Sequence, residues 1–171
     1  MNAACRSTSD RCGKSEIVTE LPRRGALLGL DYGTKRFGVA VSTPDQTISS
    51  PLAICNRGEP DDDAQFLRSK VAAYTAVGLV VGLPVHMSGD EGGKAREARE
   101  FGEWASQVTG LPVVFHDERF STAFAEYHLM IAGLTEKQRK SKMDKLAAQF
   151  ILASYLERRG PEGSPERHAG E

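Results

Sequence analysis

The chain lacks the sequence features of membrane and secreted proteins. None of its apolar runs approaches the ~20 residues that a membrane-spanning helix needs. Its first residues are polar and charged, without the apolar segment that a secretory signal contains. We therefore expect a cytoplasmic protein with no membrane partner.

Cysteine is scarce, and neither cysteine nor histidine is spaced as a metal ligand. The three cysteines form no C-x-x-C pair, and the four histidines share no ligand spacing. Cys5 and Cys12 lie in the polar N-terminal stretch, away from any apolar segment. These features argue against a disulfide framework and against a structural zinc site.

An overall excess of positive charge is also missing. The 22 Lys and Arg residues are balanced by 23 Asp and Glu residues, for a net charge of −1. Basic residues are instead concentrated over 137–145, where Lys140 and Lys142 lie. Local charge governs nucleic-acid binding more than total charge does, so this run is a candidate phosphate-binding segment. A solvated helix surface is the alternative interpretation.

Composition divides the 171 residues into one domain and two tails. A hydrophobic content of 40% and a charged content of 26% are typical of a globular domain. Residues 1–24 are polar and lack periodicity, and residues 160–171 are rich in proline and glycine. We expect both tails to be disordered, and the folded domain to cover residues 25–159.

Strands and helices are predicted to alternate within this domain. Short apolar runs predict strands, and apolar residues at helical spacing predict helices. Three strands followed by alternating helices and strands imply an α/β domain with a mixed five-stranded sheet and helices on both faces. This is the element order of the ribonuclease H-like fold. The expected strands cover 26–31, 37–42, 48–54, 78–83 and 111–116, and the expected helices cover 61–76, 93–109, 122–132 and 141–159.

Carboxylates occupy the ends of two predicted strands and the region where the last helix should begin. Asp31 ends the first strand, Asp117 and Glu118 follow the last strand, and Asp144 lies near the start of the final helix. Strand ends and a helix start can meet at one rim of a sheet. Such oxygen donors suit Mg²⁺ or Mn²⁺, which support phosphodiester hydrolysis. We therefore interpret these acids as a candidate metal-dependent catalytic site.

Each of these acids also has a structural explanation. Asp31 suits an Asx-type turn, and Asp117 with Glu118 suits a surface ion-pair cluster. Asp144 fits an S-x-x-D pattern in which Ser141 caps the last helix. The three basic residues beside the acids, Lys35, Arg36 and Arg119, are candidate phosphate contacts.

Four motifs, in this order along the chain, resemble the YqgF family, also called RuvX, the Holliday junction resolvase-like proteins. They are GLDYGTKRFG (29–38), GLP with MSGDEG (82–84 and 87–92), DERFST (117–122) and DKLAAQFIL (144–152). The resemblance implies a ribonuclease H-like, metal-dependent nuclease in the 5′-end maturation of the 16S ribosomal RNA precursor. It implies that the metal is held by Asp31, by one acid of the 117–118 pair, of which we favour Glu118, and by Asp144.

Three other functions share some of these features. A Holliday junction resolvase that acts on branched DNA would use the same acids and needs a symmetric dimer. A non-catalytic RNA-binding factor in ribosome assembly would need only the basic run. A sugar kinase or an actin-like ATPase has a similar phosphate loop but needs a second domain. The expected partners are therefore pre-16S ribosomal RNA or branched DNA, and ribosomal subunit precursors, with the protein a monomer or a homodimer.

Overall fold

The structure of the protein, a computed structural model, describes residues 17–85, 92–119 and 136–160. The side chains of residues 136–145 are not among the described features. The helix predicted over 122–132 and most of both predicted tails lie outside these residues. No described helix combines the length and the apolarity that a membrane span requires.

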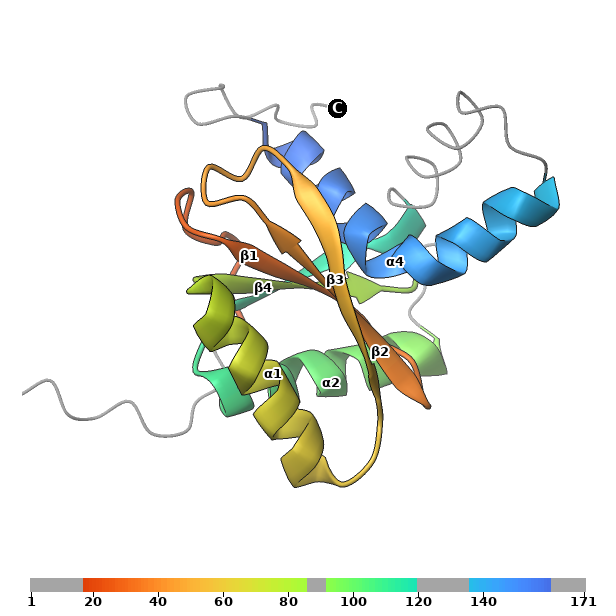
Figure 1. Cartoon of the computed structure of the whole chain (residues 1–171), viewed down its shortest axis with the longest axis horizontal. Coiled ribbons are helices and arrows are strands. Elements are labelled where there is room, and N and C mark those ends of the chain that lie inside the picture. Colours follow the sequence, from red (N-terminus) through yellow and green to blue (C-terminus); the bar gives the residue numbers. More distant parts are fainter. Residues whose placement is uncertain (1–16, 86–91, 120–135, 161–171) are drawn as a thin grey trace, which may run out of the picture.

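Within the described residues, five strands and three helices follow the predicted order (Figure 1). Most boundaries lie within two residues of those expected from the apolar runs. The strands are β1 (Leu27–Asp31), β2 (Arg36–Ser42), β3 (Ser49–Asn56), β4 (Gly78–Leu83) and β5 (Val113–Asp117), and the helices are α1 (Pro60–Tyr74), α2 (Gly93–Thr109) and α4 (Glu136–Arg159).

The strands form one mixed sheet in the order β3-β2-β1-β4-β5. The pairs β1–β2 and β2–β3 are antiparallel, whereas β4 runs parallel to both β1 and β5. Strand β3 lies at the edge, as the proline at position 51 predicts, because proline cannot donate a ladder hydrogen bond. The carboxyl ends of β1, β4 and β5 therefore meet at one rim, where sites form in sheets of this kind.

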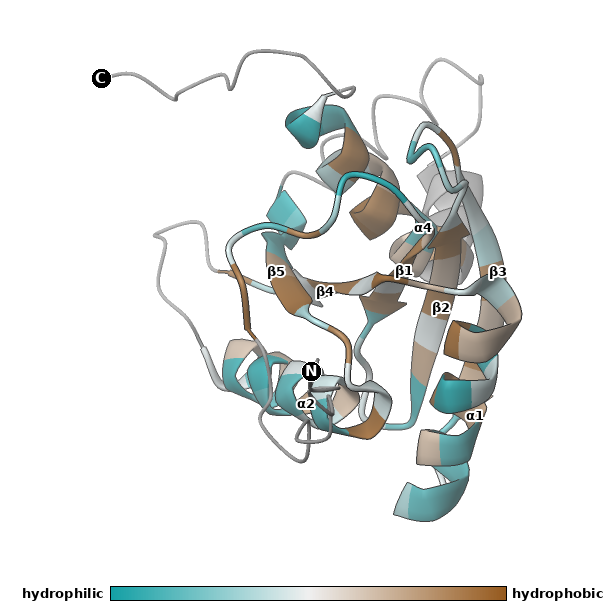
Figure 2. Cartoon of the chain, turned by 90° about the vertical axis from the view of Figure 1, so that its left-hand side faces the viewer, coloured by the Kyte–Doolittle hydropathy of each residue, from teal (hydrophilic) through white to brown (hydrophobic). Residues whose placement is uncertain are grey.

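Helices α1 and α2 cover one face of the sheet and α4 covers the other (Figure 2). Side chains of β4 alternate between these layers: Leu79 and Val81 pack towards α1 and α2, and Val80 packs towards α4. Because both faces are covered, the central strands are continuously apolar rather than alternating. Each fully buried Leu or Val contributes roughly 1.5–3 kcal/mol to folding.

A glycine in β1 allows α4 to lie directly on the sheet. A Cβ atom at Gly29 would lie 2.7 Å from the Leu152 Cβ and 2.8 Å from the Ala148 backbone oxygen. At position 29, a residue with a side chain would therefore push β1 and α4 apart. This close approach fixes where α4 crosses the rim of the sheet.

The prediction for the start of the last helix is wrong. Helix α4 begins at Glu136, not at Ser141, so Asp144 lies inside the helix and does not take part in an N-terminal S-x-x-D cap. The residues that were missed, EKQRK at 136–140, have no apolar periodicity but are all strong helix formers. They extend the helix but lack the hydrophobic pattern on which the prediction depended.

Residues 17–24, which the sequence analysis assigned to the N-terminal tail, lie against the domain. The Val18 N–H donates to the Val113 oxygen at 3.0 Å, and the Leu21 side chain is only 3% exposed. Leu21 fills the space that a side chain at Gly78 would occupy, and Arg159 donates to the Leu21 carbonyl. The segment has few apolar residues, but one of them enters the core, which composition alone does not reveal.

Candidate active site

Asp31 ends β1 on the face of the sheet that α4 covers. It is opposite Gly38 of β2 in the register. A Cβ atom at Gly38 would lie 3.7 Å from the Asp31 Cβ and 3.3 Å from the Ala148 Cβ. Asp31 therefore lies at the rim of the sheet, beside the middle of α4.

Glu118 immediately follows β5 and reaches over the end of β4. Its Oε1 atom lies 2.7 Å from the position that a Cβ atom at Gly82 would take, and the Ile151 Cδ1 lies 2.5 Å from the same point. Since β4 lies between β1 and β5, the missing side chain at Gly82 leaves the room into which Glu118 extends. The sequence analysis placed Gly82 in the expected strand over 78–83 and in the GLP motif, but its role beside Glu118 depends on a contact that no local pattern marks.

The pKa of Glu118 shows that its carboxylate is influenced by Asp31. Burial raises the pKa of Glu118 from its ordinary 4.5 to about 7, and the negative charges of Asp31 and then Asp117 add to this rise. Lys94 opposes it. Two carboxylates with limited access to water repel each other unless a cation or a proton compensates them. The pair therefore has the electrostatic character of a cation site.

Asp117 has a different environment from Glu118. The Arg119 Nη2 lies 2.6 Å from the Asp117 Oδ2, and the Arg119 backbone N–H donates to Asp117 Oδ1 at 2.9 Å. Burial raises the pKa of Asp117, but these bonds outweigh it and the net pKa is lowered. Because side chains alternate along a strand, Asp117 leaves β5 on the face opposite to His116, which contacts Ser154 of α4. The ion-pair explanation therefore fits Asp117, while Glu118 faces Asp31.

The third acidic position lies on α4, one helical turn before Ala148. Ala148 contacts the sheet beside Asp31, so α4 brings residue 144 towards the same rim. The side chains of Asp144, Lys140 and Lys142 lie outside the described features. Among the described residues no group of three His, Cys, Asp or Glu side chains gathers as a metal site. Of the predicted metal ligands, only Asp31 and Glu118 therefore have described side chains.

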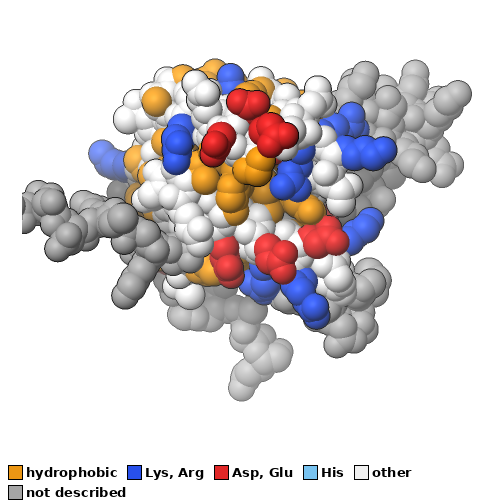
Figure 3. Space-filling view, turned by 90° about the horizontal axis from the view of Figure 1, so that it is seen from below, with side chains coloured by type: hydrophobic (Ala, Val, Ile, Leu, Met, Phe, Trp, Pro, Cys, Tyr) orange, Lys and Arg blue, Asp and Glu red, His pale blue; other side chains and the backbone are white. Residues whose placement is uncertain are grey.

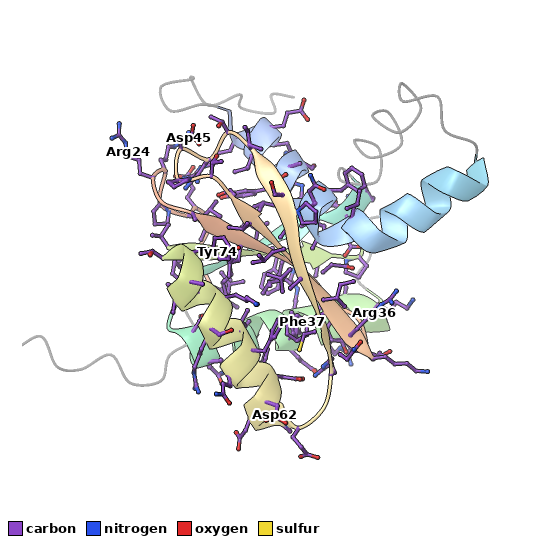
Figure 4. The ribbon with its side chains drawn as sticks, viewed as in Figure 1. Arg24, Arg36, Phe37, Asp45, Asp62 and Tyr74 are labelled. Atoms are coloured by element: carbon purple, nitrogen blue, oxygen red, sulfur yellow. The ribbon has the colours of Figure 1, made fainter. Side chains whose placement is uncertain are left out.

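The turn between β1 and β2 carries the other two predicted phosphate contacts. Lys35 and Arg36 are exposed there, and Figure 4 shows Arg36 extending from the start of β2. The backbone N–H of Arg57 donates to the Lys35 carbonyl at 3.0 Å, and the Arg57 guanidinium lies 5.5 Å from the centre of the Tyr32 ring. Sequence reasoning missed Arg57, because a contact with a turn more than twenty positions earlier leaves no spacing signal.

Comparison with known proteins identifies the family. The model of the RuvX family, described as "Holliday junction resolvase", matches residues 25–158. The chain belongs to the RuvX family. The resemblance inferred from the four motifs is thereby confirmed.

Two curated relatives of this RuvX chain carry the name "Putative pre-16S rRNA nuclease". The protein of Paracoccus denitrificans is 43% identical over 148 residues, which cover 86% of this chain and 94% of the relative. The protein of Rhodopirellula baltica is 40% identical over 136 residues, or 80% and 79% of the two chains.

A solved structure shows the same fold. It is titled "T. thermophilus RuvC in complex with Holliday junction substrate" and superposes with a TM-score of 0.51 at 14% identity, covering 80% of this chain and 98% of that one. At this identity the likeness concerns the fold alone. The expected ribonuclease H-like fold is confirmed.

The raised pKa of Glu118 predicts a pH-dependent stability in EDTA. The folded protein holds this proton more tightly than the unfolded chain, so the free energy of unfolding falls as the pH rises from about 4.5 to about 7. Over this pH range the free energy of unfolding should fall by about 3 kcal/mol. We expect the Glu118→Gln variant to lose this decrease, as measured by urea unfolding at several pH values.

His116 provides the opposite slope and makes a comparison with the wild type necessary. Burial and then the charge of Arg158 lower the pKa of His116 from 6.5 to about 4, so its contribution to stability grows as the pH rises between these values. Both proteins share this contribution, which cancels in their difference. Parallel curves for the wild type and Glu118→Gln would contradict the prediction.

Proposed function

We propose that this RuvX chain is a metal-dependent nuclease that cleaves RNA in the 5′-end maturation of the 16S ribosomal RNA precursor. The names of its curated relatives support the substrate class. One structural observation carries the chemistry: Asp31 and Glu118 share the rim of the sheet, and their proximity helps to raise the pKa of Glu118. Such a pair is costly to keep charged without a cation.

The donor set fits a divalent cation. Carboxylate oxygens are the ligands that Mg²⁺ and Mn²⁺ prefer, and the repulsion between the two half-buried acids is what a bound cation relieves. Asp31 and Glu118 would hold it, with Asp144 as the third ligand from α4. When bound, the cation activates water and stabilises the negative charge that develops during phosphodiester hydrolysis.

The other residues have supporting roles in this proposal. Ordered strand ends hold Asp31 and Glu118 in place, which limits the reorganisation needed during the reaction. Lys35 and Arg36 in the exposed turn beyond Asp31 bind the phosphate backbone on one side of the cleaved bond. Arg119 keeps Asp117 in an ion pair and so leaves Glu118 as the acid that faces Asp31.

The substrate and the metal can be tested together. A 5′-extended 16S precursor RNA and a four-way DNA junction are incubated side by side with the protein, in Mg²⁺, in Mn²⁺ or in EDTA. We expect cleavage of the RNA with either metal and none in EDTA. Binding of the precursor without cleavage in any metal would contradict the proposal and favour an RNA-binding assembly factor.

The description of the family model favours one second candidate, a resolvase of branched DNA. Resolution needs two cuts and therefore a symmetric dimer. Preferential cleavage of the DNA junction, by a protein that sediments as a dimer at the assay concentration, would establish this candidate. Cleavage of the RNA by a monomer would exclude it.

A further inference from the structure

A groove follows the outer edge of β5, the edge that faces away from β4. Figure 2 shows β5 at this end of the sheet, with α4 above it. The cavity volume of about 360 Å³ lies within the range of ligand sites. We call it the β5 groove; it is lined by Thr19 and Glu20, by residues 114–117 of β5, and by Tyr155, Arg158 and Arg159 of α4.

The β5 groove leads to the candidate active site. Asp117, the last residue of β5, lines the groove, and the next residue is Glu118. A chain bound along the groove therefore ends beside the paired carboxylates. Lys35 and Arg36 are not among the residues that line this groove, whereas Arg119 pairs with Asp117 of its lining.

The groove carries an excess of positive charge. Glu20 pairs with Arg23 at 3.9 Å, and Asp117 pairs with Arg119 at 2.6 Å, so each acid of the lining has an arginine beside it. Two further arginines, 158 and 159, line the groove. By contrast, the face seen from below in Figure 3 has acidic and basic side chains intermixed around apolar ones.

Neutral oxygens hold Arg159 in place. Arg159 donates to neutral oxygens, the Pro22 carbonyl at 3.1 Å and the Gln46 Oε1 at 3.0 Å. Arg158 is exposed and lines the same groove. An anion in the groove would therefore meet one guanidinium group that is already held in place, that of Arg159.

The edge of β5 also offers backbone donors. Among the described residues, the N-terminal segment pairs with this edge at Val113, where the Val18 N–H donates to the Val113 oxygen. Backbone groups alternate in direction along a parallel strand, so the N–H groups of Phe115 and Asp117 point to the same side as the Val113 oxygen. Backbone N–H groups and arginines together are the usual ligands of phosphate.

We propose that the β5 groove binds a single-stranded segment of the RNA substrate next to the cleaved bond, with Arg158 contacting a phosphate. This inference rests on the proposed function, because it takes RNA as the substrate. The excess positive charge favours a polyanion over an extended protein segment, which would also fit a strand edge.

Binding in EDTA tests the inference without cleavage. The full chain with Asp31→Asn is titrated into a fluorescent single-stranded RNA that has the sequence of the 5′ extension, and anisotropy is measured at several salt concentrations. We expect Arg158→Ala to weaken binding about tenfold, which is typical of one charge-assisted contact. It should also reduce the slope of log K against log salt by about 0.7. Arg158→Lys should retain most of the slope.

A matched control lies on the opposite face of the sheet. Arg68 of α1 is exposed and donates to the Val108 carbonyl, so Arg68→Ala removes the same charge elsewhere. We expect this variant to bind RNA as the parent does. Circular dichroism and thermal unfolding confirm that all variants are folded.

Crosslinking locates the bound strand. RNA that contains 4-thiouridine is irradiated with the parent protein, and we expect mass spectrometry to find the crosslink on Tyr155 or on Thr19. Unchanged affinity in Arg158→Ala, or crosslinks confined to other surfaces, would overturn the inference and leave an extended protein segment as the ligand. Loss of RNA binding in Arg158→Ala without cleavage by the wild type would support the groove while refuting the nuclease.

Discussion

The Asp31→Asn variant should lose RNA cleavage by about a thousandfold or more while remaining folded. Asparagine has nearly the same shape as aspartate but lacks the charge that a divalent cation requires, and losing a group that stabilises developing charge costs about two to three orders of magnitude or more. Single-turnover cleavage of the precursor RNA in Mn²⁺ measures the loss.

The same variant makes a second prediction, which separates chemistry from folding. The charge of Asp31 helps to raise the pKa of Glu118, so removing it should lower that pKa and relieve repulsion in the metal-free protein. We therefore expect its melting temperature in EDTA to equal or exceed that of the wild type. A large drop would mean that Asp31 has a structural role, as in the Asx-turn interpretation.

A matched control for Asp31 lies in the first turn of α1. Asp62 is exposed on the opposite side of the sheet from α4, and Figure 4 shows it at the lower end of α1. Asp62→Asn makes the same chemical change away from the rim. We expect its cleavage rate to match the wild type, and an equal loss in both variants would count against a site at Asp31.

The Gly29→Ala variant should lose about 3 kcal/mol of stability, at the upper end of the usual cost of overpacking. The added methyl would meet the Leu152 Cβ and the Ala148 backbone oxygen, and neither atom can move without shifting the whole of α4. Urea unfolding measures the change. Because α4 carries Asp144 to the rim, we also expect cleavage to fall in the fraction of protein that stays folded.

Gly58 provides the control for this substitution. A Cβ atom at Gly58 would have no neighbour within 4 Å, and its φ is not positive. Gly58→Ala should therefore be neutral or stabilise the protein by up to about 1 kcal/mol, through the reduced freedom of the unfolded chain. If Gly29→Ala behaved like Gly58→Ala, α4 would not lie directly on β1.

Local patterns were sufficient to predict the order of the elements. Apolar runs locate β1, β4 and β5 because buried strands of a covered sheet are apolar throughout, and Pro51 places β3 at an edge. They also place Asp31 at a strand end. These features depend on neighbouring residues, and a sequence contains that information directly.

Other features depend on contacts between distant segments, and only the tertiary structure decided them. Asp117 and Glu118 are equivalent in sequence, but the gap at Gly82 admits Glu118 while Arg119 pairs with Asp117. The burial of Leu21 against Gly78 is of the same kind. Periodicity records which side of its own element a residue occupies, whereas packing decides which distant residue fills the space beside it.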